Sequence, residues 1–328
     1  MARSPLPRLT RVAVTAALAL AGLAGTAPAA HAGTATPSLR VLTYNTFLMS
    51  RNLYPNWGQE HRADAIARAP FFQGQDVVVL QEAFDNGASD TLGKAAAAAY
   101  PHRTPVVGRS TSGWDATGGA YASTTPEDGG VTLLSKWPIL RKEQYVYEDA
   151  CGSDWWSNKG FVYAVLDVNG ARVHVVGTHT QSTDSGCGAG EARADRAAQF
   201  RAIDSFLAAK DIPASEQVLV AGDMNVDGRG DEYASMLENA GLVPADARTG
   251  HPYSFDTQEN SVARYRYPDD PREDLDHVLF KKGHARPAAP WTNEVVQAPS
   301  APWTVSSWGT SYTYTDLSDH YPVIASAG

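Results

Sequence analysis

A series of short apolar runs constrains this chain most, because each has the length of a buried β-strand and ends in polar or glycine residues. Seven runs are rich in Val, Leu and Phe: Leu39–Tyr44, Asp76–Leu80, Val131–Leu134, Phe161–Leu166, Val173–Gly177, Val218–Ala221 and Leu275–Phe280. Between them, helical patterns cover Glu60–Phe72, Asp90–Tyr100, Glu191–Ala209 and Glu232–Ala240. Some strands follow one another without a helix. The class is therefore α/β (α+β), and two packed mixed β-sheets flanked by helices fit better than one wound parallel sheet.

The first 32 residues predict an export signal. Arginines make the start positive, residues 12–24 are apolar but too short to span a bilayer, and residues 30–32 form a small-residue cleavage site. We expect a secreted, extracellular protein whose residues 33–328 form a single domain, without repeats or linkers. Glycine-, serine- or proline-rich stretches within it predict loops at Gly108–Gly119, Thr183–Gly190 and Tyr267–Asp274.

Charge and cysteine content narrow the classes of partner. The formal net charge is −9, and removal of the export signal makes the chain more acidic still. This balance argues against tight, charge-driven nucleic-acid binding, although a bound divalent cation can bridge an acidic protein to phosphate. Cys151 and Cys187 have no CxxC or CxxH companion for a metal site. In an exported protein we expect a disulfide between them, with free thiols as the alternative.

Glu82 and Asn45 are polar residues at the exits of two apolar runs. A carboxylate at the end of a buried strand is costly unless it reaches solvent or serves a cation. A hard cation such as Mg²⁺ takes one or two carboxylates, and the amide carbonyl of Asn45 could bind or orient a metal-bound water. Taken alone, Glu82 is better explained as a solvated strand end, and Asn45 as an Asx-turn.

Two further polar clusters follow later runs. His179 lies between two threonines, where an imidazole could donate to a phosphate oxygen or a leaving group, or simply bond to backbone. Asp223 and Asn225 follow Gly222, which lets the chain approach a ligand closely. They point the same way if the chain stays extended, and could orient a nucleophile or stabilise an equatorial oxygen. The alternative is an ordinary turn.

The last cluster, Ser318-Asp319-His320-Tyr321-Pro322, lies near the C-terminus. Asp276 and His277 are neighbours in an earlier strand, so alternation directs their side chains to opposite faces. An inward-pointing carboxylate needs a partner, and it can fix the tautomer of a histidine and support its cation. We therefore predict that Asp276 pairs with His320 and that His277 is structural.

Together these clusters are similar to the motif set of the endonuclease/exonuclease/phosphatase superfamily, which has the deoxyribonuclease-I-like fold. The motifs occur in that family's order: Tyr44-Asn45, Gln81-Glu82, Gly130-Val131, Ser135-Lys136-Trp137-Pro138, Thr178-His179, Gly222-Asp223-Met224-Asn225, Leu275-Asp276 and Ser318–Pro322. Each motif is weak alone, whereas the ordered set is specific and covers nearly all of residues 33–328. The resemblance implies a four-layer sandwich and metal-dependent cleavage of a phosphate ester.

Within that superfamily the chain most resembles the secreted bacterial neutral sphingomyelinases. The resemblance rests on residues 129–139, on Asn158-Lys159-Gly160-Phe161, on the two cysteines and on an aromatic segment before the last motif. It implies a phospholipase-C-type hydrolase that cleaves sphingomyelin to ceramide and phosphocholine by in-line attack of water. The expected partner is a sphingomyelin-containing membrane surface and not a nucleic acid, and the expected state is a monomer.

The resemblance also implies a role for each site residue. Glu82 is the main ligand of Mg²⁺ (Mn²⁺ and Co²⁺ are other possible ions), Asn45 lies beside it, and Asp319 reaches the metal through water. His320 is the general base for water, oriented by Asp276. The implied substrate contacts come from four further residues, which orient water and phosphate, touch the phosphate or assist the leaving group: Asp223, Asn225, His179 and Lys159.

The aromatic segment predicts a membrane-contacting hairpin near residues 300–314, through Trp303, Trp308 and Tyr312. Trp and Tyr suit a lipid interface, although core packing is the alternative for any single one. Trp155-Trp156 is a second candidate, because adjacent residues on a strand cannot both face inward. Two other functions stay open: a secreted metal-dependent nuclease or phosphomonoesterase on the same fold, and a lipid-binding protein without catalysis.

Overall fold

Two seven-stranded sheets form the centre of the structure, a computed structural model that describes residues 36–328. In spatial order the first contains β11 (Ala247–Gly250), β13 (Trp291–Val295), β16 (Val323–Ala327), β1 (Arg40–Asn45), β2 (Val77–Gln81), β5 (Thr132–Ser135) and β3 (His102–Arg103). The second contains β10 (Leu242–Val243), β12 (Asp276–Lys281), β9 (Gln217–Asp223), β8 (Ala171–His179), β7 (Gly160–Val168), β6 (Ile139–Val146) and β4 (Ala116–Gly119). The expected export signal lies outside the described residues.

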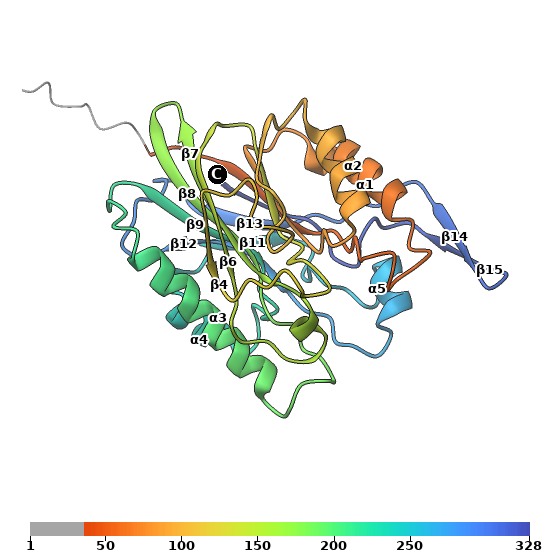
Figure 1. Cartoon of the computed structure of the whole chain (residues 1–328). Helices are drawn as coiled ribbons and strands as arrows, with labels where there is room; N and C mark the ends of the chain where they lie inside the picture. Colours follow the sequence, from red (N-terminus) through yellow and green to blue (C-terminus); the bar gives the residue numbers. More distant parts are fainter. Residues whose placement is uncertain (1–35) are drawn as a thin grey trace, which may run out of the picture. The chain divides into compact units, whose positions relative to one another are not determined.

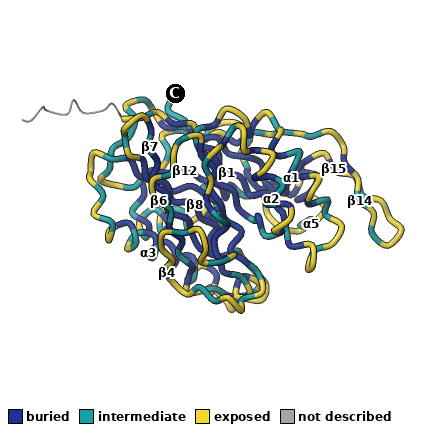
Figure 2. The backbone as a smooth tube through the Cα atoms, turned by 45° about the horizontal axis from the view of Figure 1, so that its top comes forward, coloured by how far each residue is buried: buried dark blue, intermediate teal, exposed yellow. Residues whose placement is uncertain are grey.

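The two sheets pack face to face because their central strands are apolar on both sides. Val41 and Val77 of the first sheet meet Leu219 and Ala221 of the second in one buried cluster between the sheets. The next residue along each strand points outward, toward helices. The tube in Figure 2 is accordingly buried along the central strands and exposed mainly in the connections.

Helices cover the outer face of each sheet (Figure 1). On the first sheet lie α1 (Gln59–Arg68) and α2 (Asn86–Ala96), and on the second lie α3 (Glu191–Ala208) and α4 (Tyr233–Asn239). The order helices, sheet, sheet, helices confirms the four-layer sandwich. The connections contain α5 (Ser261–Arg266) and two short 3₁₀ helices, η1 (Pro70–Phe72) and η2 (Gly152–Trp156).

The seven predicted strands are all present, and so are the four predicted helices, with two changes in their bounds. The first helix ends before Pro70, because Ala69 is extended there and a separate 3₁₀ turn follows. The second begins earlier than expected, because the Asp85 carboxylate caps it by accepting from the Ala88 N–H. The stretch Gly108–Gly119 is not all loop, since Ala116–Gly119 pairs in parallel with β6.

A two-stranded hairpin of β14 (Trp303–Ser307) and β15 (Thr310–Tyr314) stands apart from both sheets, at the right of Figure 1. Trp308 at its tip is fully exposed, and Tyr312 is half-buried. The expectation for Trp303 was wrong: its side chain is buried, and its indole N–H donates to the Asp316 carbonyl. Alternation along β14 turns this residue toward α1.

A disulfide joins Cys151 and Cys187, as predicted. On the chain-entropy model, closing such a loop stabilises the fold by about 3–4 kcal/mol. It fixes the start of η2, where Trp155 and Trp156 are both largely exposed. They lie on a 3₁₀ turn and not on a strand. Within residues 36–328, none of the helices has the length and apolarity of a transmembrane span.

Candidate active site

Strand register brings the predicted polar residues of the second sheet into one row. Asp223 at the end of β9 pairs on one side with His179 of β8 and on the other with Asp276 of β12. Their side chains are buried. In the first sheet, Asn45 pairs with Gln81, so Glu82 follows at the same edge. The polar ends of central strands therefore meet between the two sheets.

His320 and Asp276 form the predicted pair, with Nδ1 of the histidine 2.8 Å from a carboxylate oxygen. Nε2 of His320 is directed toward Asp223, 3.7 Å from its Oδ2. Burial disfavours the imidazolium, but the carboxylates of Asp276 and Asp223 outweigh burial and raise the pKa of His320 well above its ordinary value. The pair fixes the tautomer that presents Nε2 to the site.

His179 lies beside Lys159, with 3.2 Å between Nε2 and the ammonium nitrogen. Because an ammonium group can only donate, Nε2 accepts and the imidazole is neutral. Burial, together with the charge of Lys159, lowers the pKa of His179 well below its ordinary value. Lys159 also donates to Asp154 and to the Thr180 carbonyl, so its donors are engaged within the protein. Here Lys159 holds His179, and its contact with a phosphate stays a prediction.

Asp223 is the centre of the cluster. Its Oδ2 accepts from the Asn45 amide at 3.0 Å and lies 3.5 Å from Nε2 of His179. The assumption that Asp223 and Asn225 lie on one extended strand is wrong, because β9 ends at Asp223 and Asn225 has φ 48°. The Asn225 backbone N–H instead donates to Asp223, and its side-chain amide donates to the Thr180 carbonyl.

Glu82 and Asp319 form a second acidic pair in the site. Glu82 is half-buried, yet its Oε2 is out of contact with solvent and has no hydrogen-bond partner among the described residues. Burial, then the charge of Asp319, raises the pKa of Glu82 to about 8, and burial also raises the pKa of Asp319. A buried carboxylate beside a half-buried one, whose inner oxygen lacks a donor, fits a hard divalent cation.

Comparison with known proteins places this site in a family. The model of the Endonuclease/Exonuclease/phosphatase family matches residues 42–320. The chain belongs to that family. A sphingomyelinase C of Bacillus cereus is 48% identical over 296 residues, which cover 88% of each chain.

Solved structures of family members agree with the fold. Sphingomyelinase C from Streptomyces griseocarneus is 74% identical, has a TM-score of 0.88, and is matched over 89% of this chain and 100% of that one. The beta toxin of Staphylococcus aureus, in a mutant with bound magnesium ions, is 46% identical with a TM-score of 0.87. It is matched over 89% of this chain and 100% of the toxin.

Three residues in or next to the site were given no role by the sequence analysis. One of them lies in a family motif and two lie outside the motifs. The Ser318 hydroxyl donates to the Asn45 carbonyl at 2.7 Å and so joins the segment before β16 to the end of β1 at the site. Asp154 was not predicted, and no sequence pattern marks it. Arg62 was also missed, although its place on the apolar stripe of α1, beside Ala63 and Ile66, is an anomaly that a helical projection reveals.

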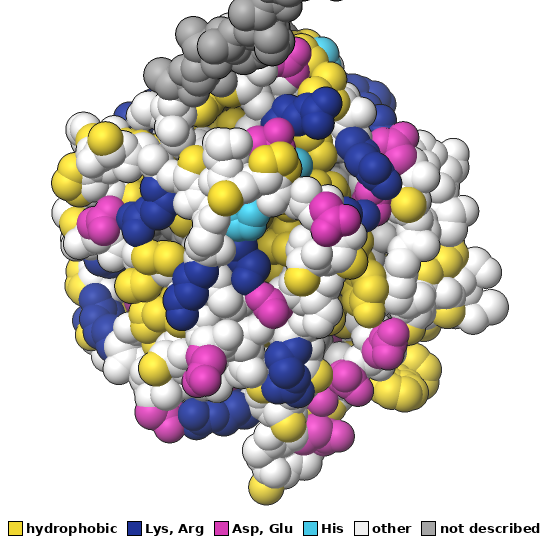
Figure 3. Space-filling view, turned by 90° about the vertical axis from the view of Figure 1, so that its left-hand side faces the viewer, with side chains coloured by type: hydrophobic (Ala, Val, Ile, Leu, Met, Phe, Trp, Pro, Cys, Tyr) yellow, Lys and Arg dark blue, Asp and Glu magenta, His cyan; other side chains and the backbone are white. Residues whose placement is uncertain are grey.

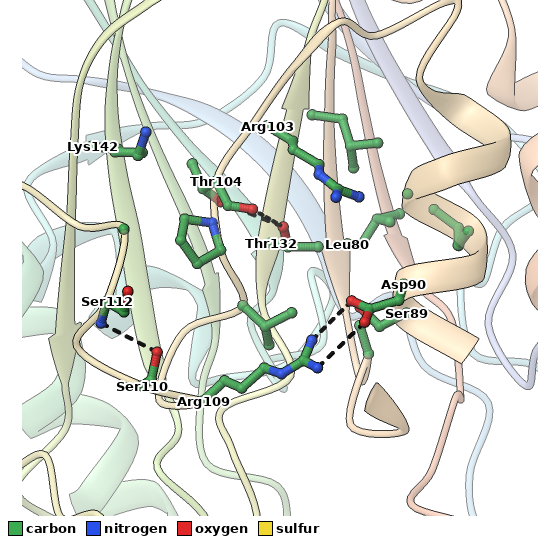
Figure 4. Close-up of a pocket in the computed structure, with 17 residues that line it drawn as sticks. Leu80, Ser89, Asp90, Arg103, Thr104, Arg109, Ser110, Ser112, Thr132 and Lys142 are labelled. Carbon is green, nitrogen blue, oxygen red and sulfur yellow. Dashed lines mark hydrogen bonds and ion pairs between the residues drawn. The ribbon is translucent and has the colours of Figure 1, made fainter. Parts of the chain in front are cut away.

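The pocket in Figure 4 lies apart from these residues. It has a volume of about 430 Å³ and is lined by α2, β3, β5 and the loop after β3, with Arg109 paired to Asp90. Its lining contains none of the predicted site residues. The buried polar cluster, and not this pocket, is therefore the candidate active site.

Proposed function

We propose that this chain is a secreted, divalent-metal-dependent sphingomyelin phosphodiesterase that releases phosphocholine and leaves ceramide. The observation that carries the proposal is near full-length similarity to proteins named sphingomyelinase C, at 48% identity in one case. The buried cluster supports it, because a base, its carboxylate partner and a carboxylate with an unpartnered oxygen, Glu82, lie together. Secretion is proposed from the pattern of residues 1–32.

In the proposed reaction His320 accepts a proton from the attacking water at Nε2, since Nδ1 is bonded to Asp276. Asp223, which lies 3.7 Å from that nitrogen, orients the water. Water attacks phosphorus, the bond to the ceramide oxygen breaks, and that oxygen takes up a proton from solvent, so that ceramide leaves as the alcohol. Neutral His179, held by Lys159, is placed to contact the phosphate as the leaving oxygen departs.

Glu82, with Asn45 and Asp319, would hold the cation. A hard divalent ion among these carboxylates would neutralise their charge, shield the substrate phosphate and lower the pKa of His320 toward neutrality. Magnesium is the proposed ion, since it prefers carboxylate and amide oxygens. Asp223 and Asp276 are assigned to the base: their oxygens and a His320 nitrogen lie within 4.8 Å of one another.

The proposed membrane contact involves two aromatic regions. Trp308 at the hairpin tip is fully exposed to solvent. The ring of Tyr312 faces that of Tyr265, with 5.0 Å between the ring centroids. Trp155 and Trp156 form the second region, next to the segment that holds Lys159. Indole and phenol rings at a surface favour the lipid interface.

A nuclease on the same fold has less support. On the face in Figure 3, basic and acidic side chains are interspersed, and neither sign gathers into one continuous patch. The net charge is −9, whereas nucleic-acid binding favours a basic surface.

Release of phosphocholine tests the proposal directly. The protein is incubated with sphingomyelin liposomes in Mg²⁺ and in chelator, with phosphatidylcholine liposomes and plasmid DNA in parallel. We expect phosphocholine to be released from sphingomyelin liposomes in Mg²⁺ and under none of the other conditions. Cleavage of DNA without sphingomyelin hydrolysis would establish the nuclease, and activity that persists in chelator would refute metal dependence.

A further inference from the structure

Arg62 is a fully buried arginine, 0% exposed, on the inner face of α1. Within residues 36–328 no carboxylate lies at ion-pair distance from its guanidinium, whereas other buried cations have such a partner, as Lys159 has Asp154. A buried charge without an ion pair is costly, so its hydrogen bonds must serve a purpose that an apolar residue could not.

The guanidinium makes four hydrogen bonds, all to backbone carbonyls. Nη1 donates to both the Thr46 carbonyl at 2.8 Å and the Leu317 carbonyl at 3.0 Å. Thr46 follows Asn45, and Leu317 precedes Ser318-Asp319-His320. A single nitrogen thus joins the two segments that carry one proposed metal ligand and the proposed base.

The same side chain fixes the backbone conformation beside Asn45. Nη2 donates to the Phe47 carbonyl at 2.6 Å, and Phe47 has φ 49°, a strained conformation for a residue other than glycine. The Phe47 N–H in turn donates to the Asn45 side chain at 3.1 Å. The rings of Phe47 and Trp303 lie 5.6 and 5.7 Å from the guanidinium carbon, which limits its movement.

We propose that Arg62 is a positioning residue of the active site: its guanidinium sets the separation between the Asn45 loop and the segment of Asp319 and His320. It does not touch the reacting atoms. Its catalytic consequence rests on the proposed function, whereas its effect on the two segments does not.

The test replaces Arg62 by lysine and, in a second variant, by glutamine, with Ile66→Ala as the matched control. Lysine keeps the charge, but its ammonium group lacks the planar set of N–H donors with which the guanidinium reaches the backbone carbonyls. Ile66 is a fully buried neighbour on α1 in the same apolar cluster, and its truncation destabilises the core while leaving the four hydrogen bonds of the guanidinium in place. Each folded variant is assayed for kcat and KM on a soluble short-chain sphingomyelin, and for amide exchange in peptides that cover residues 42–48 and 314–321.

We expect Arg62→Lys to lose kcat by about 10²-fold with little change in KM, as misplacement of catalytic groups does. Amide exchange in both peptides should be faster in the Arg62 variants than in wild type. In Ile66→Ala, kcat and the exchange rates of both peptides should stay at their wild-type values. Unchanged kcat in Arg62→Lys, an equal loss of kcat in Ile66→Ala, or unchanged exchange in both peptides would overturn the inference. A wild-type protein that fails to cleave sphingomyelin would sink the proposed function, yet the exchange contrast would still decide the role of Arg62.

Discussion

At the scale of single residues, the site sets functional chemistry against stability. Glu82 keeps an oxygen out of solvent without a donor, and it does so at a strained φ of 52°. Asp319 adds a second carboxylate to the same place. Such an arrangement is unfavourable in the metal-free protein and would become favourable with the proposed cation bound.

Glu82→Gln tests this directly. The amide keeps the shape but cannot ionise, so we expect sphingomyelin hydrolysis to be abolished while the metal-free variant unfolds no earlier than wild type, because a carboxyl group whose ionisation is opposed by burial has been removed. His320→Ala should lower kcat by about 10²–10⁴-fold, the range for loss of a general base. Activity and thermal unfolding in chelator are the measurements. Near-normal activity in either variant contradicts the assignment.

His277 gives a prediction about pH. Burial, with the charge of Arg248, lowers the pKa of this imidazole to about 3, and its Nε2 donates to the Val226 carbonyl. The unfolded chain takes up the proton near its ordinary pKa of 6.5, whereas the folded chain does not, so stability is present above that pH and is lost toward pH 3.

The loss amounts to at most roughly 5 kcal/mol over that window. In His277→Gln, which keeps a donor but does not titrate, this component should be absent. Urea unfolding of both proteins across the window measures it as a difference. Parallel stability curves would show that His277 does not contribute.

The sequence was informative about residues where two independent constraints agreed. Asp276 and His320 could be paired because alternation turned one inward and imidazole chemistry demanded a carboxylate. Lys159 could not be placed, because its ion-pair partner Asp154 lies in a 3₁₀ turn without a recognisable pattern. Arg62 was missed because its partners are backbone carbonyls, which no sequence motif records.

At the scale of elements, apolar runs predicted the central strands well because these strands are buried on both faces. Peripheral strands such as β4 and β11 are largely exposed, so they lack an apolar pattern and were not foreseen. The aromatic content of residues 300–314 predicted the hairpin, but it did not predict which aromatic ring faces the core. That choice depends on register: Trp303 is opposite Tyr314 and both are buried.

The hairpin therefore offers a matched pair of tryptophan variants. Trp308→Ala should leave stability unchanged and weaken binding to sphingomyelin liposomes by about tenfold, as expected when one large apolar side chain no longer partitions. Trp303→Ala should destabilise the fold by about 3–5 kcal/mol through loss of core packing. Liposome sedimentation and urea unfolding measure the two effects. Hydrolysis of a soluble substrate should survive in Trp308→Ala, and equal loss on both substrates would refute the membrane role.

At the scale of the whole molecule, the polar cluster of the candidate site lies between the two halves of the sandwich. Glu82 and Asn45 follow strands of the first sheet, whereas Asp223 and Asp276 belong to the second. Asn45 already donates across the interface to Asp223, and Ser318 donates to the Asn45 carbonyl. A cation held by Glu82 and Asn45 would fix the Asn45 side chain, whose amide makes this contact between the layers.

Magnesium should accordingly stabilise the whole fold and not only activate it. Binding to the native state adds RT ln(1 + [L]/Kd), or about 2.7 kcal/mol at a hundredfold excess over Kd, which corresponds to several degrees in Tm for a domain of this size. We expect this rise for wild type in Mg²⁺ relative to chelator, and none for Glu82→Gln. Trp308→Ala serves as the control, since it lies far from the acidic pair and should show the full rise. A Tm that rises equally in Glu82→Gln would place the stabilising cation elsewhere, because the gain would then not depend on the carboxylate that the site leaves without a partner.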